Sequence, residues 1–163
     1  MKAFNVFDGE LDRSRDRPGF AWRATAVGEH IGAVKMGASL YELEPGQRSF
    51  PYHYEYGNEE WLLVVAGRPT LRDPEGEHEL RPGDVVCFRE GPEGAHQVRN
   101  DTAEPIRVLI LSTKVSPDTA VYPDSGKVWV RDYAPGTPPG DDHEPLDSVL
   151  RADATVDFLD GER

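Results

Sequence analysis

Short apolar runs of about five to nine residues recur along the first 130 positions, separated by glycine and proline. They include AWRATAV, EWLLVVAG and IRVLILST, and are rich in β-branched and aromatic residues. Turn sequences such as EPGQ, DPEGE and RPGD lie between them. Short strands with turn chemistry between them indicate a β-sandwich or barrel. Residues 20–130 contain no sustained helical period, so we predict an all-β fold.

Alternation within two of these runs brings polar residues onto one side of the predicted sheet. In YHYEY, His53 and Glu55 share a face, because alternate side chains of a strand point the same way. In EEWLLVVAG, one face carries Glu60, Leu62 and Val64, and the other carries Trp61, Leu63 and Val65. Both faces of this second strand are therefore apolar, and we expect both to be covered.

Composition limits the partners. The formal net charge of −12 and the absence of a basic patch argue against nucleic acid and anionic membranes. The chain has no apolar run of about 18 residues, and its N-terminus lacks the apolar core of a signal peptide, so we expect a soluble cytoplasmic protein. The single cysteine, Cys87, lies in the apolar run DVVCF and is interpreted as a small buried residue.

A glutamate on the interior face of a strand needs compensation, because burying an unpaired charge is costly. A metal ion held by Glu60 and His53 would supply it. A third ligand is available in AHQVRN, where His96 shares a face with Val98. Two imidazoles and a carboxylate form the ligand set of non-haem Fe(II) sites, and they also bind Mn or Zn. The alternative is a metal-free, hydrogen-bonded polar interior that faces a ligand.

These residues fall in two motifs, and through them residues 37–113 resemble the cupin superfamily. The motifs of that family are G-x5-H-x-H-x3,4-E-x6-G and G-x5-P-x-G-x2-H-x3-N. The matching positions are Gly46, His53, Glu55, Glu60 and Gly67 for the first motif, and Gly83, Pro92, Gly94, His96 and Asn100 for the second. The first glycine stands one residue too far from His53, and the second motif is two residues longer, with Arg89 where a proline is expected. Glu55 replaces the second histidine.

The resemblance implies a double-stranded β-helix, or jelly-roll barrel. We expect residues 1–36 to form an N-terminal extension with the first strands, 37–130 the cupin barrel, and 131–163 an acidic C-terminal arm. The proline- and glycine-rich stretch APGTPPGDDHEP suits neither a helix nor a central strand. The residues after it are expected either to form a short helix capped at Asp147 or to dock on a neighbouring molecule.

The resemblance also implies a ligand set. Carried over by position, the metal ligands are His53, Glu55, Glu60 and His96, and the ion is divalent. Fe or Mn is favoured, and Zn or Ni is possible. In the alternative, Glu55 does not bind the metal, and the other three residues hold it. Glu55 would then be a catalytic general base or a group that supports the ligands through hydrogen bonds.

Cupins carry out many reactions, so the fold alone does not define one. The resemblance implies a metalloenzyme of the oxygenase, isomerase or decarboxylase type, acting on a small organic acid, sugar or phenolic molecule. The alternative is a non-catalytic cupin that binds or senses a small molecule. Outward-facing aromatic residues lead us to expect a homodimer; they are Tyr52, Tyr54, Tyr56 and Trp61.

Overall fold

The computed structural model describes residues 1–137 and 144–162, which form three antiparallel sheets. The six-stranded sheet has the order β1 (Arg13–Arg15), β2 (Trp22–Thr25), β3 (Met36–Leu43), β10 (Ile106–Thr113), β5 (Glu60–Ala66) and β8 (Val85–Phe88). The four-stranded sheet has the order β13 (Asp147–Arg151), β12 (Lys127–Arg131), β11 (Asp118–Tyr122) and β4 (Tyr54–Glu55). The three-stranded sheet has the order β7 (Gly76–Glu79), β6 (Thr70–Asp73) and β9 (Gln97–Arg99).

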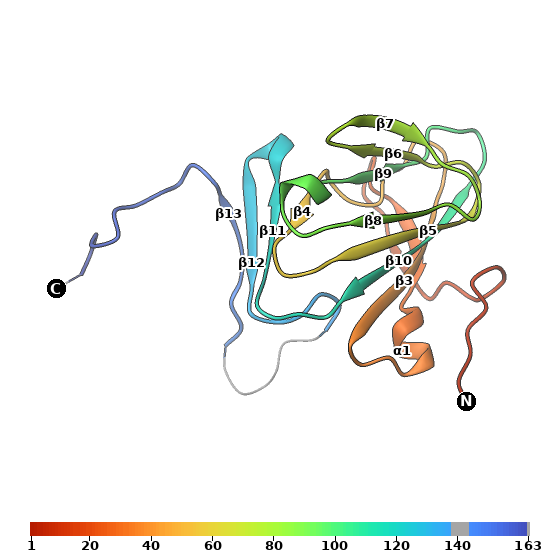
Figure 1. Ribbon diagram of the computed structural model, residues 1–163, viewed down its shortest axis with the longest axis horizontal. Helices are drawn as coiled ribbons and strands as arrows, with labels where there is room; N and C mark the ends of the chain where they lie inside the picture. Colours follow the sequence, from red (N-terminus) through yellow and green to blue (C-terminus); the bar gives the residue numbers. More distant parts are fainter. Residues whose placement is uncertain (138–143, 163) are drawn as a thin grey trace.

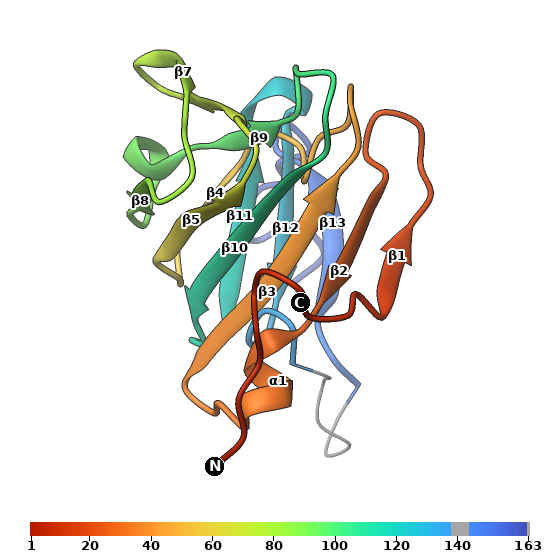
Figure 2. The ribbon, with the colours of Figure 1, turned by 90° about the vertical axis from the view of Figure 1, so that its right-hand side faces the viewer.

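The sheets are arranged around a common interior (Figure 1). The four-stranded sheet stands on one side, the three-stranded sheet lies across the top, and β3, β10, β5 and β8 close the other side. Figure 2 shows β10 and β3 in front of β11, β12 and β13, so the large sheet and the four-stranded sheet are separate layers. This is the predicted double-stranded β-helix. The helical pieces are short: α1 (Val27–Ile31), η1 (Pro92–Gly94) and η2 (Pro123–Ser125).

Strand β10 shows how the core is built. Its burial alternates strictly, with Ile106, Val108, Ile110 and Ser112 pointing inward. The first three belong to the main apolar cluster, with members from β3, β5, β6, β8 and β9. Each large apolar side chain buried there contributes about 1.5–3 kcal/mol. The series ends in a serine, so the interior changes from apolar to polar along this strand.

The outer face of the six-stranded sheet is covered only in part. Val65 and Leu40 pack there in a second cluster with Val27 of α1 and with N-terminal residues. At the other end of β5, Trp61 is 47% exposed. The expectation that both faces of this strand are covered is therefore confirmed at Val65 and wrong at Trp61.

Gly67 shows why the first motif ends in glycine. Its φ of +77° lies in the left-handed region that side chains rarely adopt. A Cβ at this position would lie 2.7 Å from Cγ2 of Ile106. The turn after β5 therefore needs a glycine in order to pass against β10.

Two expectations are wrong. Residues Asp147–Arg151 form strand β13, paired antiparallel with β12, and not a helix capped at Asp147. An aspartate in the first position of such a segment is compatible with a helix or a strand. Pairing with the edge of β12 favours the strand. Cys87 is exposed, because it lies on the outer face of β8 beside Trp61. The stretch APGTPPGDDHEP lies partly outside the described residues.

Among the residues that the structure describes, no helix is long and apolar enough to cross a membrane.

Candidate metal centre

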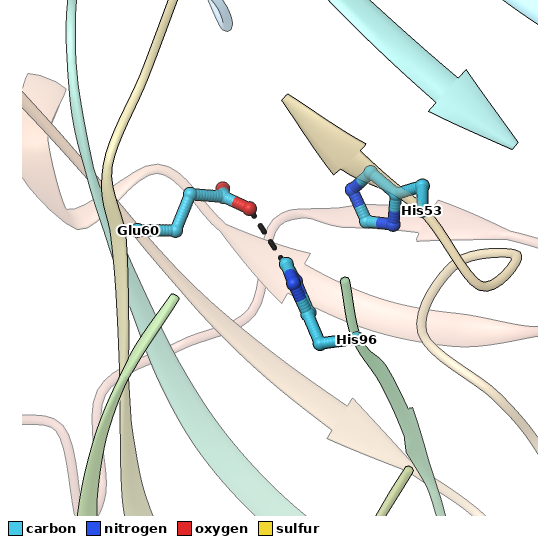
Figure 3. Close-up of side chains that lie close together, drawn as sticks. All are labelled: His53, Glu60 and His96. Atoms are coloured by element: carbon cyan, nitrogen blue, oxygen red, sulfur yellow. Dashed lines mark ion pairs between the residues drawn. The ribbon is translucent and has the colours of Figure 1, made fainter. Parts of the chain in front are cut away.

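Three side chains from separate segments converge in the interior, as Figure 3 shows. His53 precedes β4, Glu60 is the first residue of β5, and His96 precedes β9. Their potential ligand atoms all lie within 4.8 Å of one another. Nε2 of His96 lies 3.4 Å from Oε2 of Glu60. Neighbouring ligand atoms around an ion with bonds of about 2.1 Å lie roughly 3 Å apart, so the spacing of His96 and Glu60 suits a divalent metal.

Backbone pairing fixes the two histidines opposite each other. The amide of His53 donates to the carbonyl of His96 over 3.1 Å, and the amide of His96 donates to the carbonyl of His53 over 2.8 Å. This isolated bridge places the imidazole rings 4.7 Å apart between their centres. The second motif is two residues longer than the family pattern, yet it delivers its histidine to this bridge.

Hydrogen bonds orient both rings. Nδ1 of His53 donates to the carbonyl of Pro51 and Nδ1 of His96 donates to the carbonyl of Gly94, each over 2.9 Å. A proton on Nδ1 leaves the lone pair of Nε2 free for a metal, the arrangement that metal-binding histidines usually adopt. Phe88 stacks on His96 at 3.7 Å, which holds that ring in place.

Burial keeps the His53 ring neutral. Desolvation, with His96 beside it, lowers the pKa of His53 from 6.5 to about 4. A proton therefore does not compete with a metal for its Nε2 at neutral pH. With two imidazoles and one carboxylate in reach, the residues fit a divalent ion of the Fe, Mn or Zn type.

Glu55 lies in the same cavity but outside this group of three. It is 8% exposed, and its Oε1 accepts a hydrogen bond from Nη2 of Arg131 over 2.7 Å. Oε2 is buried and has no hydrogen-bond partner among the described residues. Burial and the charges of Glu60 and Asp118 raise the pKa of Glu55 above its ordinary value, and outweigh the opposing effect of Arg131.

Arg131 and Asp118 were not found from the sequence. Arg131 is 5% exposed and Asp118 is 1% exposed. Nε of the arginine donates to Oδ2 of the aspartate over 3.0 Å, and Nη2 makes a second bond to the same oxygen. Arg131 was expected to belong to the acidic arm, residues 131–163. The one available signal was KVWVR, in which a charge ends an apolar strand next to the predicted barrel.

The cavity encloses about 280 Å³ between the six-stranded and four-stranded sheets. Besides the acidic and histidine residues, Tyr41, Ser112 and Lys114 line it. Lys114 continues the inward series of β10 and is half-buried. Its ammonium has no hydrogen bond or ion pair with the described residues. Carboxylates and imidazoles therefore line the interior, and the wall carries an ammonium that has no partner among the described residues.

Comparisons with known proteins agree with this architecture. A protein from Acidithiobacillus ferrooxidans, whose name proposes sugar phosphate isomerase activity, is 26% identical, over 88% of this chain and 86% of that one, with a TM-score of 0.72. A cupin named sugar phosphate isomerase from Silicibacter pomeroyi is 27% identical, over 86% and 98%, with a TM-score of 0.71. TT1209 from Thermus thermophilus is 27% identical, over 61% and 88%, with a TM-score of 0.51.

No curated protein matches the sequence. The family model for the cupin domain matches residues 39–112, which include His53, Glu55, Glu60 and His96. Both motifs thus fall inside the matched segment, and the strands around them form the barrel expected of that domain. Residues 39–112 therefore form a cupin domain, and over most of its length the chain is similar in fold to two proteins of the sugar phosphate isomerase-like cupin class.

Proposed function

We propose that this cupin is a metal-dependent isomerase of a small hydroxy-carbonyl compound that carries an anionic group. One observation carries the proposal: the cavity that holds the His53, Glu60 and His96 cluster also holds two groups without a partner among the described residues, Oε2 of Glu55 and the ammonium of Lys114. Metal ligands, a proton-transfer group and an anion-binding group therefore share one small space.

His53, Glu60 and His96 would hold the ion, and Glu55 would stay outside its ligand set. Fe or Mn suits this nitrogen and oxygen donor set, and Zn or Ni is also compatible. When bound, the ion supplies Lewis-acid polarisation of the carbonyl and hydroxyl oxygens of the substrate. Because only three protein side chains would hold the ion, substrate oxygens could also bind it.

Glu55 would move the proton. An aldose–ketose isomerisation transfers one proton between adjacent carbons and one between adjacent oxygens, and needs no oxidant or reductant. In its ionised form, Oε2 of Glu55 would take the proton from the carbon next to the carbonyl and return it to the original carbonyl carbon. Arg131 occupies Oε1, whereas Oε2 has no hydrogen-bond partner in the described ranges, so we assign this role to Oε2.

The cavity size and Lys114 support the substrate class. About 280 Å³ accommodates a molecule the size of a short sugar derivative. A lysine with no partner in the described part of a chain with 30 acidic and 18 basic residues suits an anionic group such as phosphate or carboxylate. The names of the two relatives with the higher TM-scores support the same class of substrate.

The test is solvent-proton exchange. The metal-loaded protein is incubated in D₂O with a panel of aldose and ketose phosphates, and deuterium in the recovered sugars is measured by NMR. We expect deuterium next to the carbonyl with wild type and a loss of at least about 100-fold with Glu55→Gln. A ligand that raises the melting temperature without exchange or turnover would instead identify a non-catalytic binding protein and refute the proposal.

We further propose that the protein is a cytoplasmic homodimer. Exposed apolar side chains support a self-contact: Trp61 and Val85 on the outer sheet face, and Phe158 in the C-terminal segment 152–162. The exposed Cys87 thiol suits a reducing compartment. Light scattering should give twice the chain mass for wild type and the monomer mass for Trp61→Arg. A monomeric wild type, or protein found outside the cytoplasm on fractionation, would contradict this proposal.

A further inference from the structure

We infer that Arg131 and Asp118 are positioning residues that hold Glu55 away from the metal and keep its second oxygen free. The inference rests on the metal centre proposed above. Glu55 stands at a ligand position of the motif, yet it lies outside the group of three potential ligands. Two buried residues from strands outside both motifs, Asp118 and Arg131, contact it directly or through each other.

Glu55 is placed where ligation would be expected. It follows His53 by two residues, occupies the motif position of a second histidine, and lines the same cavity as the three cluster residues. A buried carboxylate beside a divalent cation normally binds it, because the ion compensates the cost of burying the charge. Some other group must therefore satisfy Glu55 for the ion to keep only three protein ligands.

Arg131 is that group, and it is rigidly held. Strands β4, β11 and β12 are adjacent in the four-stranded sheet, and they carry Glu55, Asp118 and Arg131 respectively. Asp118 pairs directly with Arg131 in the register of β11 and β12. The guanidinium also lies 4.3 Å from the ring of Trp129. Its position is thus set by the sheet, by an ion pair and by an aromatic face.

Asp118 is anchored in turn. Its Oδ1 accepts a hydrogen bond from the amide of Gly57 over 3.2 Å, and its Oδ2 accepts both bonds from Arg131. These contacts connect the turn after β4 to Asp118, Asp118 to Arg131, and Arg131 to Oε1 of Glu55. This closed arrangement fixes one oxygen of Glu55 and leaves Oε2 as the only one without a partner among the described residues.

The first test compares cobalt binding by full-length wild type, Glu55→Gln and Glu60→Gln, using Co(II) alone as the probe. Visible absorption of the bound ion reports ligand number, and titration gives Kd. We expect Glu55→Gln to keep the wild-type spectrum, with Kd within about threefold, whereas Glu60→Gln weakens binding by about 100-fold or more. Equal losses in the two variants would overturn the inference while leaving the metal centre intact.

The second test releases Glu55. In Arg131→Met, Glu55 is free to bind the ion, so we expect tighter Co(II) binding, by about tenfold or more, and a changed spectrum. Adding Glu55→Gln to Arg131→Met should abolish both changes, and Arg131→Lys should retain the wild-type spectrum. Tighter Co(II) binding that persists in the double variant would come from the removed positive charge alone and would overturn the inference.

The outcomes remain separable if a variant fails. If Arg131→Met does not fold, the comparison of Glu55→Gln with Glu60→Gln decides alone. If wild-type protein binds no Co(II), the proposed metal centre fails, and the inference fails with it. If wild type binds Co(II) and Glu55→Gln does not, Glu55 is a ligand, and only the positioning role is wrong.

Discussion

Arg131 donates a hydrogen bond to Glu55 across 2.7 Å, and so joins the end of β12 to the first cupin motif. Asp118, on the strand between them, binds the same guanidinium. Segments that are 76 residues apart in the chain therefore share one buried charge cluster. Residues near the C-terminal end of the fold therefore contribute to the interior of the site. A barrel ending before Arg131 would lack the hydrogen-bond donor to Glu55.

The first prediction concerns stability. Replacing Arg131 by Met leaves the carboxylates of Glu55 and Asp118 buried without their counter-ion. We expect the free energy of unfolding to fall by about 3–5 kcal/mol, as when one partner of a buried ion pair is removed. Urea denaturation measures it, with the exposed Arg68→Met as control. A loss below about 1 kcal/mol, comparable to that of the control, would show that Arg131 does not stabilise the two buried carboxylates.

Asn100, the last residue of the second motif, is predicted to stabilise the fold without taking part in metal binding. It is fully buried, and its side chain bonds the carbonyls of Leu43 and Glu104 and the amide of Thr102. Asn100→Ala should cost roughly 2–4 kcal/mol in urea denaturation, because these buried backbone groups lose their partner. The folded variant should retain the metal content of wild type. Loss of metal without loss of stability would show that the residue belongs to the site.

Glu42 gives a prediction for pH. Burial acts to raise its pKa, but hydrogen bonds and charge from Arg107 and Arg23 outweigh burial and place the pKa below 4.5. The unfolded chain therefore binds more protons as the pH falls through 4.5, so this contribution to stability is present above that pH and is lost below it. Between pH 5 and about 3, Glu42→Gln should reduce the fall in the urea midpoint. If the urea midpoint of Glu42→Gln fell with pH as steeply as that of wild type, the lowered pKa of Glu42 would be refuted.

Lys114 gives a prediction for substrate recognition. A ligand with an anionic group should lose about tenfold or more in affinity when Lys114 is replaced by Gln, because a charge-assisted contact is lost. Lys35→Gln is the matched control, since Lys35 is exposed, and its carbonyl accepts the amide of Lys114. Calorimetry with ribose 5-phosphate and with ribose separates a loss of binding to the phosphate from a loss of binding to the sugar. Equal losses for both sugars, or in both variants, would contradict the role of Lys114.

Much of the fold was predictable, because the signals are local. Strand alternation identified Glu60, Leu62 and Val64 as inward-facing, and the turn residues separated the strands correctly. The motif spacing identified His53 and His96, whose side chains the structure brings together with that of Glu60. Local pattern was sufficient wherever a side chain's environment is set by its own strand.

The Arg131–Asp118 pair was not predictable in this way. Its partners come from β4, β11 and β12, and only the sheet register brings them together. The ambiguous segment after residue 145 became a strand for a similar reason, since the free edge of β12 overrode its weak helical pattern. Cys87 was misread because an apolar run on an edge strand looks like one in the core.

Elemental analysis of untagged protein purified without chelator tests the proposed metal centre most directly. Wild type is compared with His53→Ala/His96→Ala and with Glu59→Gln, which alters an exposed neighbour of the site. We predict close to one equivalent of a divalent metal, with Fe or Mn favoured, in wild type and in Glu59→Gln, and none in the double variant. Wild type without metal, and with none taken up on reconstitution, would contradict the proposed metal centre.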